Sequence, residues 1–122
     1  MTLMREDMLA SILRELGNVS PAIEAIAAVS LDGVVLATHG SRSAQSEAQG
    51  AITAALCALG ERTAQEHARG PIEQILVKGK QGYLLISPAG PNVILALSVK
   101  RDGNLDLVYA GIGRALQALA KL

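Results

Sequence analysis

The pattern of apolar and polar residues predicts eight regular elements along this chain. Three stretches repeat apolar residues at every third or fourth position, as amphipathic helices do, and five short apolar runs lie between turn residues, as strands do. The expected helices are residues 2–16, residues 46–68 and a last helix that begins at Gly103 or Asn104. The expected strands are residues 23–30, 33–38, 72–78, 83–87 and 93–99.

Short turns between these strands predict an antiparallel sheet. The pair Asp32-Gly33 lies between two apolar runs and is a strong signal for a hairpin. Residues 79–82 and 88–92 contain the glycines, prolines and asparagine typical of turns, so the last three strands are expected to form an antiparallel meander.

Two of the strands are apolar on both faces, which indicates that helices cover both sides of the sheet. Residues 83–86 and 93–97 are continuously apolar rather than alternating. We therefore expect an α+β fold, a three-layer α/β/α sandwich of order α-β-β-α-β-β-β-α. Its five-stranded antiparallel sheet would carry the long middle helix on one face and the two terminal helices on the other. A chain of 122 residues is expected to form one domain, residues 1–122.

The middle helix, residues 46–68, is apolar on more than one side, which is typical of a helix that is buried on more than one side. One stripe holds the bulky side chains and is expected to face the sheet. A second stripe holds only small side chains and would let another helix approach closely. The first stripe is Ala48, Ile52, Ala55, Leu56 and Leu59, and the second is Ala51, Ala54 and Ala58. Two alternatives stay open: contact through Thr53, Cys57 and Gly60, or an outer face that is only loosely covered.

The strand expected at residues 72–78 is the most polar of the five, so it is the candidate for an edge of the sheet. A free edge is a template for pairing with another chain, and the middle helix and this edge together would make a self-complementary two-fold surface. We therefore expect a homodimer. The expected interface residues are Glu47, Ala51, Ala54, Ala58, Glu61, Arg62, Gln65, Glu73, Ile75 and Val77.

Composition and charge argue against several classes of function. Eleven basic residues balance eleven acidic ones, whereas nucleic-acid binding needs a local excess of Lys and Arg. No apolar run approaches the roughly 20 residues that cross a bilayer, and no signal peptide begins the chain, so we expect a cytoplasmic protein without membrane insertion.

The sequence contains no convincing catalytic, metal or cofactor site. His39 and His67 are isolated, and the single cysteine, Cys57, lies within a helix, so no Cys/His cluster has the spacing of metal ligands. The fragment Gly111-Ile112-Gly113 lacks the rest of a dinucleotide motif, and no phosphate-binding loop occurs. We expect a protein that is not an enzyme and that uses no cofactor.

The chain resembles the Roadblock family, which is named for a dynein light chain and includes the bacterial MglB-type regulators of small GTPases. The resemblance extends over essentially the whole length. It rests on residues 27–37 with the Asp-Gly turn, the Ala-rich helix from Ser46, residues 82–90 and residues 111–114. It implies a homodimer in which the middle helices lie antiparallel at the two-fold axis and the strands after them pair.

The resemblance also implies a partner, because such proteins commonly bind Ras-like small GTPases as regulators or scaffolds, or attach to motor complexes. The leading hypothesis is therefore a dimeric platform that binds a Ras-like GTPase and modulates its nucleotide cycle, for example by activating hydrolysis, or its localisation. The alternatives are a small-molecule sensor similar to PAS and GAF modules, which would need an internal pocket, and a motor-complex adaptor.

Overall fold

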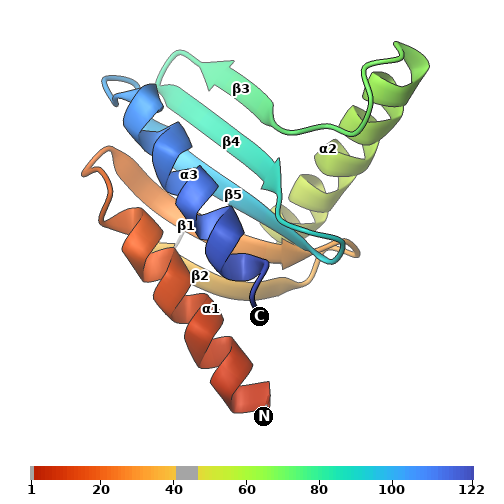
Figure 1. The fold of residues 1–122 in the computed structure, drawn as a ribbon. Helices are drawn as coiled ribbons and strands as arrows, with labels where there is room; N and C mark the ends of the chain where they lie inside the picture. The colour runs from red at the N-terminus through yellow and green to blue at the C-terminus, as the bar shows by residue number, and fades with distance from the viewer. Residues whose placement is uncertain (1, 41–46) are drawn as a thin grey trace.

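The computed structural model describes residues 2–40 and 47–122, and it contains three helices and five strands within them (Figure 1). The helices are α1 (Thr2–Gly17), α2 (Glu47–Glu66) and α3 (Leu105–Leu119). The strands are β1 (Ile23–Ser30), β2 (Val35–Gly40), β3 (Ile75–Gly79), β4 (Gly82–Pro88) and β5 (Val93–Lys100). This order confirms the expected α-β-β-α-β-β-β-α pattern. The predicted start of the middle helix at residue 46 lies outside the described residues.

The five strands form one antiparallel sheet in the order β2-β1-β5-β4-β3. Within it, β3, β4 and β5 are the expected meander, and β1 pairs with both β2 and β5. The strands at the two edges are β2 and β3. The prediction that the strand after the middle helix lies at an edge is therefore confirmed.

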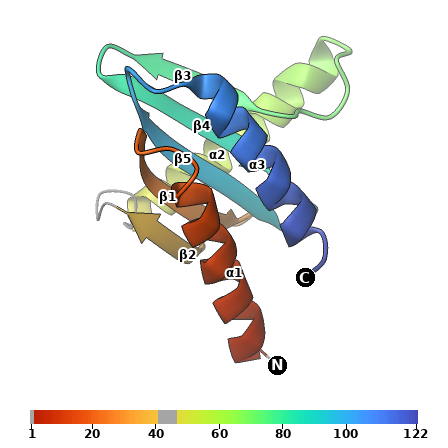
Figure 2. The ribbon, with the colours of Figure 1, turned by 60° about the vertical axis from the view of Figure 1, so that its left-hand side comes forward.

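Helices cover both faces of the sheet, as expected from strands that are apolar on both sides. Helices α1 and α3 lie side by side on one face, and α2 crosses the other (Figures 1 and 2). The larger part of the core lies between the sheet and α1 and α3, where Leu13, Leu85 and Leu97 are fully buried. A smaller cluster of Cys57, Ile86, Ile94 and Ala96 lies under α2.

The hairpin between β1 and β2 is closed by the residues that predicted it. The Ser30 hydroxyl donates a hydrogen bond to the Asp32 carboxylate and accepts one from the Val34 N–H over 3.0 Å. Gly33 follows with a φ of +92°, a conformation that suits glycine. Asp32 thus has a structural role in the turn.

The third strand is shorter than the sequence predicts, because it begins at Ile75 rather than at residue 72. The backbone N–H of Ile72 donates to the Glu61 carboxylate over 2.9 Å, and the Glu73 carbonyl accepts a bond from the Ser87 hydroxyl over 3.4 Å. Side chains therefore bind the backbone groups of residues 72–73. The apolar pattern alone assigns these residues to the strand.

Candidate interaction surface

The side of α2 that faces the sheet is made of small residues. Gly50, Thr53 and Cys57 are its buried residues. A Cβ atom at position 50 would collide with the carbonyl oxygen of Gly33 and lie 3.0 Å from Val35 Cγ2. A Cβ atom at Gly60 would lie 2.7 Å from Cδ1 of Ile75. The helix can therefore lie very close to the sheet, which itself supplies the large side chains of this interface.

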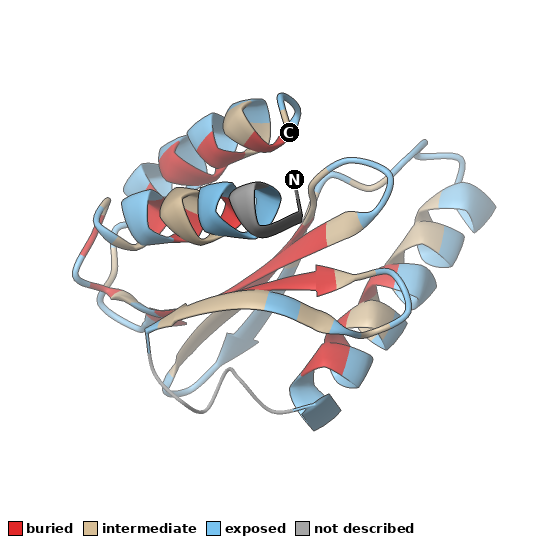
Figure 3. Cartoon of the chain, turned by 90° about the horizontal axis from the view of Figure 1, so that it is seen from below, coloured by how far each residue is buried: buried red, intermediate tan, exposed pale blue. Residues whose placement is uncertain are grey.

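The bulky stripe of α2 points mainly away from the sheet, so the prediction that it packs on the sheet is wrong. Ile52 is 50% exposed and Leu59 is 62% exposed, while only Leu56 packs partly on the core. Figure 3 shows the buried parts of α2 on the side of the sheet and its outer side exposed. The physical reason is the close approach at Gly50 and Gly60, which leaves no room for large side chains beneath the helix.

One flank of α2 leaves part of the sheet uncovered. A hollow of about 220 Å³ lies beside the first half of the helix, and a mostly apolar groove of about 470 Å³ lies beside the second half. The hollow is lined by Ala27, Val29, Gln49, Gly50, Thr53, Leu84, Ala96 and Ser98. The groove is lined by Leu56, Leu59, Gly60, Thr63, Ala64, His67, Arg69, Ile72, Gln74 and Ile75.

The structure distributes the expected interface residues of α2 over two environments. Five of them are exposed: Glu47, Ala51, Ala58, Arg62 and Gln65. Ala54 is half-buried and packs on the smaller core cluster, and Glu61 is half-buried and holds Ile72. Of the alternative contact face, Thr53 and Cys57 are buried against the protein's own sheet, so this face is occupied within the protomer.

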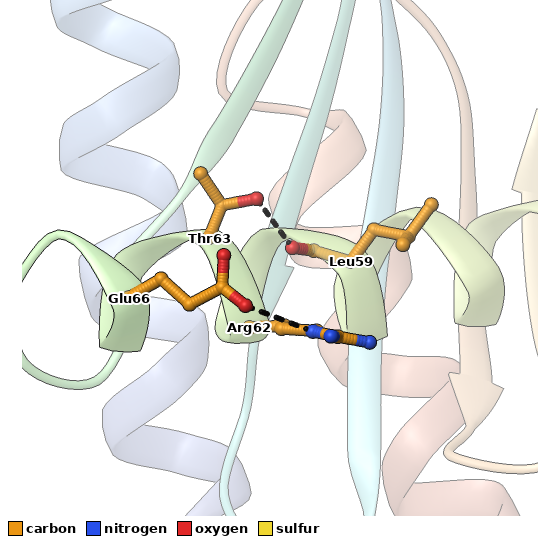
Figure 4. Close-up of polar contacts among 4 residues, drawn as sticks. All are labelled: Leu59, Arg62, Thr63 and Glu66. Carbon is orange, nitrogen blue, oxygen red and sulfur yellow. Dashed lines mark hydrogen bonds and ion pairs between the residues drawn. The ribbon is translucent and has the colours of Figure 1, made fainter.

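The polar contacts of the outer helix surface are local. The Arg62 guanidinium forms an ion pair with Glu66 over 3.1 Å, and the Thr63 hydroxyl donates to the Leu59 carbonyl over 2.8 Å (Figure 4). Both partners of the ion pair are well exposed, so it contributes little to stability. These contacts leave the apolar side chains of Ile52 and Leu59 accessible.

The edge strand β3 adds a second accessible apolar surface next to α2. Ile75 packs against the smaller core cluster, whereas Val77 is 43% exposed. Leu76 is 44% exposed, but it pairs with Leu85 and so lies on the face of α1 and α3. Cross-strand pairing of Val77 with Leu84 places Val77 on the α2 face of the sheet, since Leu84 packs against the cluster under α2. Glu73 precedes the strand and is exposed.

The titratable side chains near this surface include the thiol of Cys57 and the imidazole of His67. Burial raises the pKa of the Cys57 thiol, and the nearby charge of Glu61 raises it further, so the thiol stays protonated near neutral pH. Within residues 2–40 and 47–122, no group of three or more His, Cys, Asp or Glu side chains could hold a metal ion. His39 lies half-buried on β2 beside Gly17, while His67 lines the groove after the end of α2.

The family comparison identifies the chain. Residues 8–98 match the model of the Roadblock/LC7 domain, and the chain belongs to this family. It is 31% identical over 112 residues to the uncharacterised protein MJ1340 of Methanocaldococcus jannaschii, covering 92% of this chain and 96% of that protein. It is 32% identical over 108 residues to the uncharacterised protein MJ0310 of the same organism, covering 88% of this chain and 93% of that protein.

Solved structures share the fold at lower sequence identity. Myxococcus xanthus MglB superposes with a TM-score of 0.88 at 17% identity, over 95% of this chain and 87% of that one. A Roadblock/LC7 domain from Streptomyces avermitilis gives 0.85 at 19% identity, over 92% and 94%. The gliding protein MglB from Thermus thermophilus gives 0.81 at 20% identity, over 94% and 87%. At these identities the likeness concerns the fold.

None of the helices that the structure describes is long and apolar enough to cross a membrane.

Proposed function

We propose that this protein is a homodimeric, non-enzymatic regulator or scaffold that binds a Ras-like small GTPase. It would modulate the nucleotide cycle or the localisation of that GTPase in the cytoplasm. The observation that carries the proposal is the accessible apolar side of α2, with Ile52 and Leu59, beside the free edge of β3 in a Roadblock/LC7 chain.

The spacing of the two large side chains supports a symmetric helix pair. Ile52 and Leu59 are seven residues apart, so at about 100° per residue they point within about 20° of each other. Their midpoint lies between Ala55 and Leu56. Two antiparallel copies of α2 that cross at this midpoint would place Ile52 of one copy against Leu59 of the other, twice.

Small residues next to this stripe of α2 support a close approach of the two helices. Ala55 lies beside Ile52 and Leu59, and Ala51 and Ala58 lie about 80–120° to one side of them. All three alanines are exposed, and small side chains permit interaxial distances of about 8 Å. We therefore keep Ala51, Ala58 and Arg62 in the proposed interface and add Ile52, Leu56 and Leu59. Glu47, Glu61 and Gln65 lie about 140–180° around the helix from Ile52, so they fall outside a surface centred on Ile52 and Leu59.

The β3 edges would pair in the same dimer and join the two sheets. An antiparallel pairing with Leu76 opposite Leu76 of the other copy places Ile75 opposite Val77 on the α2 face. These apolar side chains would continue the surface under the helix pair. Glu73, just before the strand, would lie at its margin.

Family membership supports a Ras-like partner. Because no catalytic group is assigned to this chain, the proposed mechanism acts through the residues of the GTPase. A dimer that binds the GTP-state switch loops more tightly than the GDP state shifts their population toward the ordered conformation. The catalytic residues of the GTPase would then be positioned by this platform. A motor-complex adaptor would use the same surface without a preference between nucleotide states.

A titration tests the proposal. The small GTPase encoded nearest to this protein would be loaded with a fluorescent GTP or GDP analogue and titrated with the purified chain, while phosphate release is followed in parallel. We expect binding that favours one nucleotide state and a changed rate of hydrolysis or exchange. Binding that ignores the nucleotide would point to the adaptor, and no binding would contradict the proposed partner.

The small-molecule sensor has less support. The described hollows beside α2 are open to the surface, and the space between the sheet and α1 and α3 is filled by buried side chains such as Leu13, Leu85 and Leu97. A sensor needs a concave pocket that encloses its ligand. A thermal-shift screen with nucleotides and metabolites would detect such a ligand as a rise in melting temperature.

A further inference from the structure

Four exposed cations gather at one end of the sheet, away from α2 and from the proposed dimer helices. Lys78 lies near the end of β3 and Lys80 in the turn that follows it, while Lys100 ends β5 and Arg101 comes directly after it. We call this group the basic tip. Cross-strand pairing of Gly82 with both Gly79 and Lys100 brings the two segments together, and Figures 1 and 2 both show them side by side.

The Arg101 side chain holds the basic tip together. Its Nη1 donates to the carbonyl oxygen of Lys80 over 3.0 Å and to that of Gly79 over 3.4 Å. The turn between β3 and β4 is thus tied to the end of β5. Within the part of the chain that the structure describes, the only ion pair closer than 4.0 Å is Arg62–Glu66, so none of the four cations is neutralised by a carboxylate at that distance.

The cations do not converge on one point. Lys78 pairs with Tyr83, which packs on the core beneath α1 and α3, so it lies on that face of the sheet. Lys100 pairs with Gly82 and lies on the opposite face. The hollow of about 220 Å³ beside Lys100 is also lined by Asp102, which disfavours a single small anion there. Cations spread over both faces at one end of the sheet suit an extended anionic surface better than a single small anion.

The residue types favour a membrane surface over an acidic protein segment. Three of the four cations are lysines, which act as flexible point charges, whereas paired recognition of carboxylates uses the planar fork of arginine. The one arginine of the basic tip uses its guanidinium to bind two carbonyl groups. We propose that the basic tip docks end-on to a bilayer that contains anionic lipids, as a peripheral contact without insertion.

Vesicle co-sedimentation tests this proposal and requires neither the GTPase nor the dimer. The probes are vesicles of phosphatidylcholine alone and of phosphatidylcholine mixed with phosphatidylglycerol, at low salt and at about 0.15 M ionic strength, where the Debye length is about 8 Å. The wild type is expected to sediment with the anionic vesicles only, and more weakly at the higher salt. Each lost cation near an anionic surface lowers partitioning about fivefold, so Lys80→Gln/Lys100→Gln should reduce it roughly 25-fold.

A matched variant separates the effect of the basic tip from the effect of the protein's net charge. Arg114→Gln/Lys121→Gln removes the same two charges from exposed positions on and after α3 and should sediment like the wild type. The proposal would be overturned if the two double variants lost vesicle binding equally, or if the wild type did not bind anionic vesicles. Retention of the wild type on duplex DNA but not on vesicles would also overturn it. Unchanged thermal melting of the variants shows that they are folded.

Discussion

The Glu61 carboxylate accepts a hydrogen bond from the backbone N–H of Ile72 over 2.9 Å, which ties the last third of α2 to the segment that leads into β3. The two elements of the proposed interface are thereby fixed relative to each other. The same carboxylate lies near enough to Cys57 to raise the pKa of its thiol. Glu61 therefore has a structural role that the apolar pattern of α2 does not reveal.

Removal of this carboxylate should destabilise the fold. Glu61→Ala leaves the half-buried N–H of Ile72 without its acceptor, and we expect a loss of about 1–2 kcal/mol in the free energy of unfolding by urea denaturation. Glu66→Ala is the control, because it removes only the exposed pair with Arg62, whose loss costs at most about 0.5 kcal/mol. Equal effects of the two substitutions would contradict the assigned role of Glu61.

Two helical glycines should respond to alanine in opposite directions. Gly50→Ala places a Cβ against the Gly33 carbonyl and 3.0 Å from Val35, so it should destabilise the protein by about 1–3 kcal/mol. Gly113 lies on the exposed side of α3, where a Cβ would meet nothing within 4 Å. Gly113→Ala should therefore stabilise the protein by about 0.5–1 kcal/mol. Thermal and urea unfolding of both variants measure this, and a tolerated Gly50→Ala would show that α2 does not lie so close to the hairpin.

The buried thiol of Cys57 should make stability fall at alkaline pH. Its pKa is raised in the folded state by burial and by Glu61, so the folded protein holds this proton more tightly than the unfolded chain does. The resulting stabilisation is complete below the ordinary pKa of 9.0 and is lost as the pH rises through the folded value. Urea unfolding of the wild type and of Cys57→Ala on both sides of this pH should show a steeper decline in the wild type. Parallel curves would contradict the raised pKa.

Much of the fold follows from local sequence signals, because they describe interactions between near neighbours. Asp32 and Gly33 form the predicted hairpin turn, and the continuously apolar β4 and β5 are covered on both faces. The start of β3 could not be found in this way, since the hydrogen bond between Glu61 and Ile72 joins residues eleven positions apart.

The orientation of α2 was missed because periodicity measures where apolar residues gather and carries no information on how near the sheet lies. The stripe of Ile52 and Leu59 is the most apolar side of the helix, yet the sheet accepts the side with Gly50, Thr53 and Cys57. A signal was present in the sequence: glycines at 50 and 60 lie roughly on one side of a helix, with small residues between them on that side. Glycine inside a helix indicates a close backbone approach.

The most direct test of the central claim is the solution mass of the protein, measured by light scattering on a sizing column. We expect the wild type at twice the 12.6 kDa mass of the chain and Ile52→Glu/Leu59→Glu at the mass of a monomer. An uncompensated carboxylate in an apolar interface costs about 3–5 kcal/mol, which raises the dissociation constant at least about 100-fold.

The control is Met8→Glu/Leu107→Glu, which places the same charges at similarly exposed apolar positions on α1 and α3, 44% and 48% exposed in the protomer. This variant should remain a dimer. A wild type with the mass of a monomer, or a dimer that survives Ile52→Glu/Leu59→Glu, would contradict the proposal that the outer side of α2 is the assembly surface.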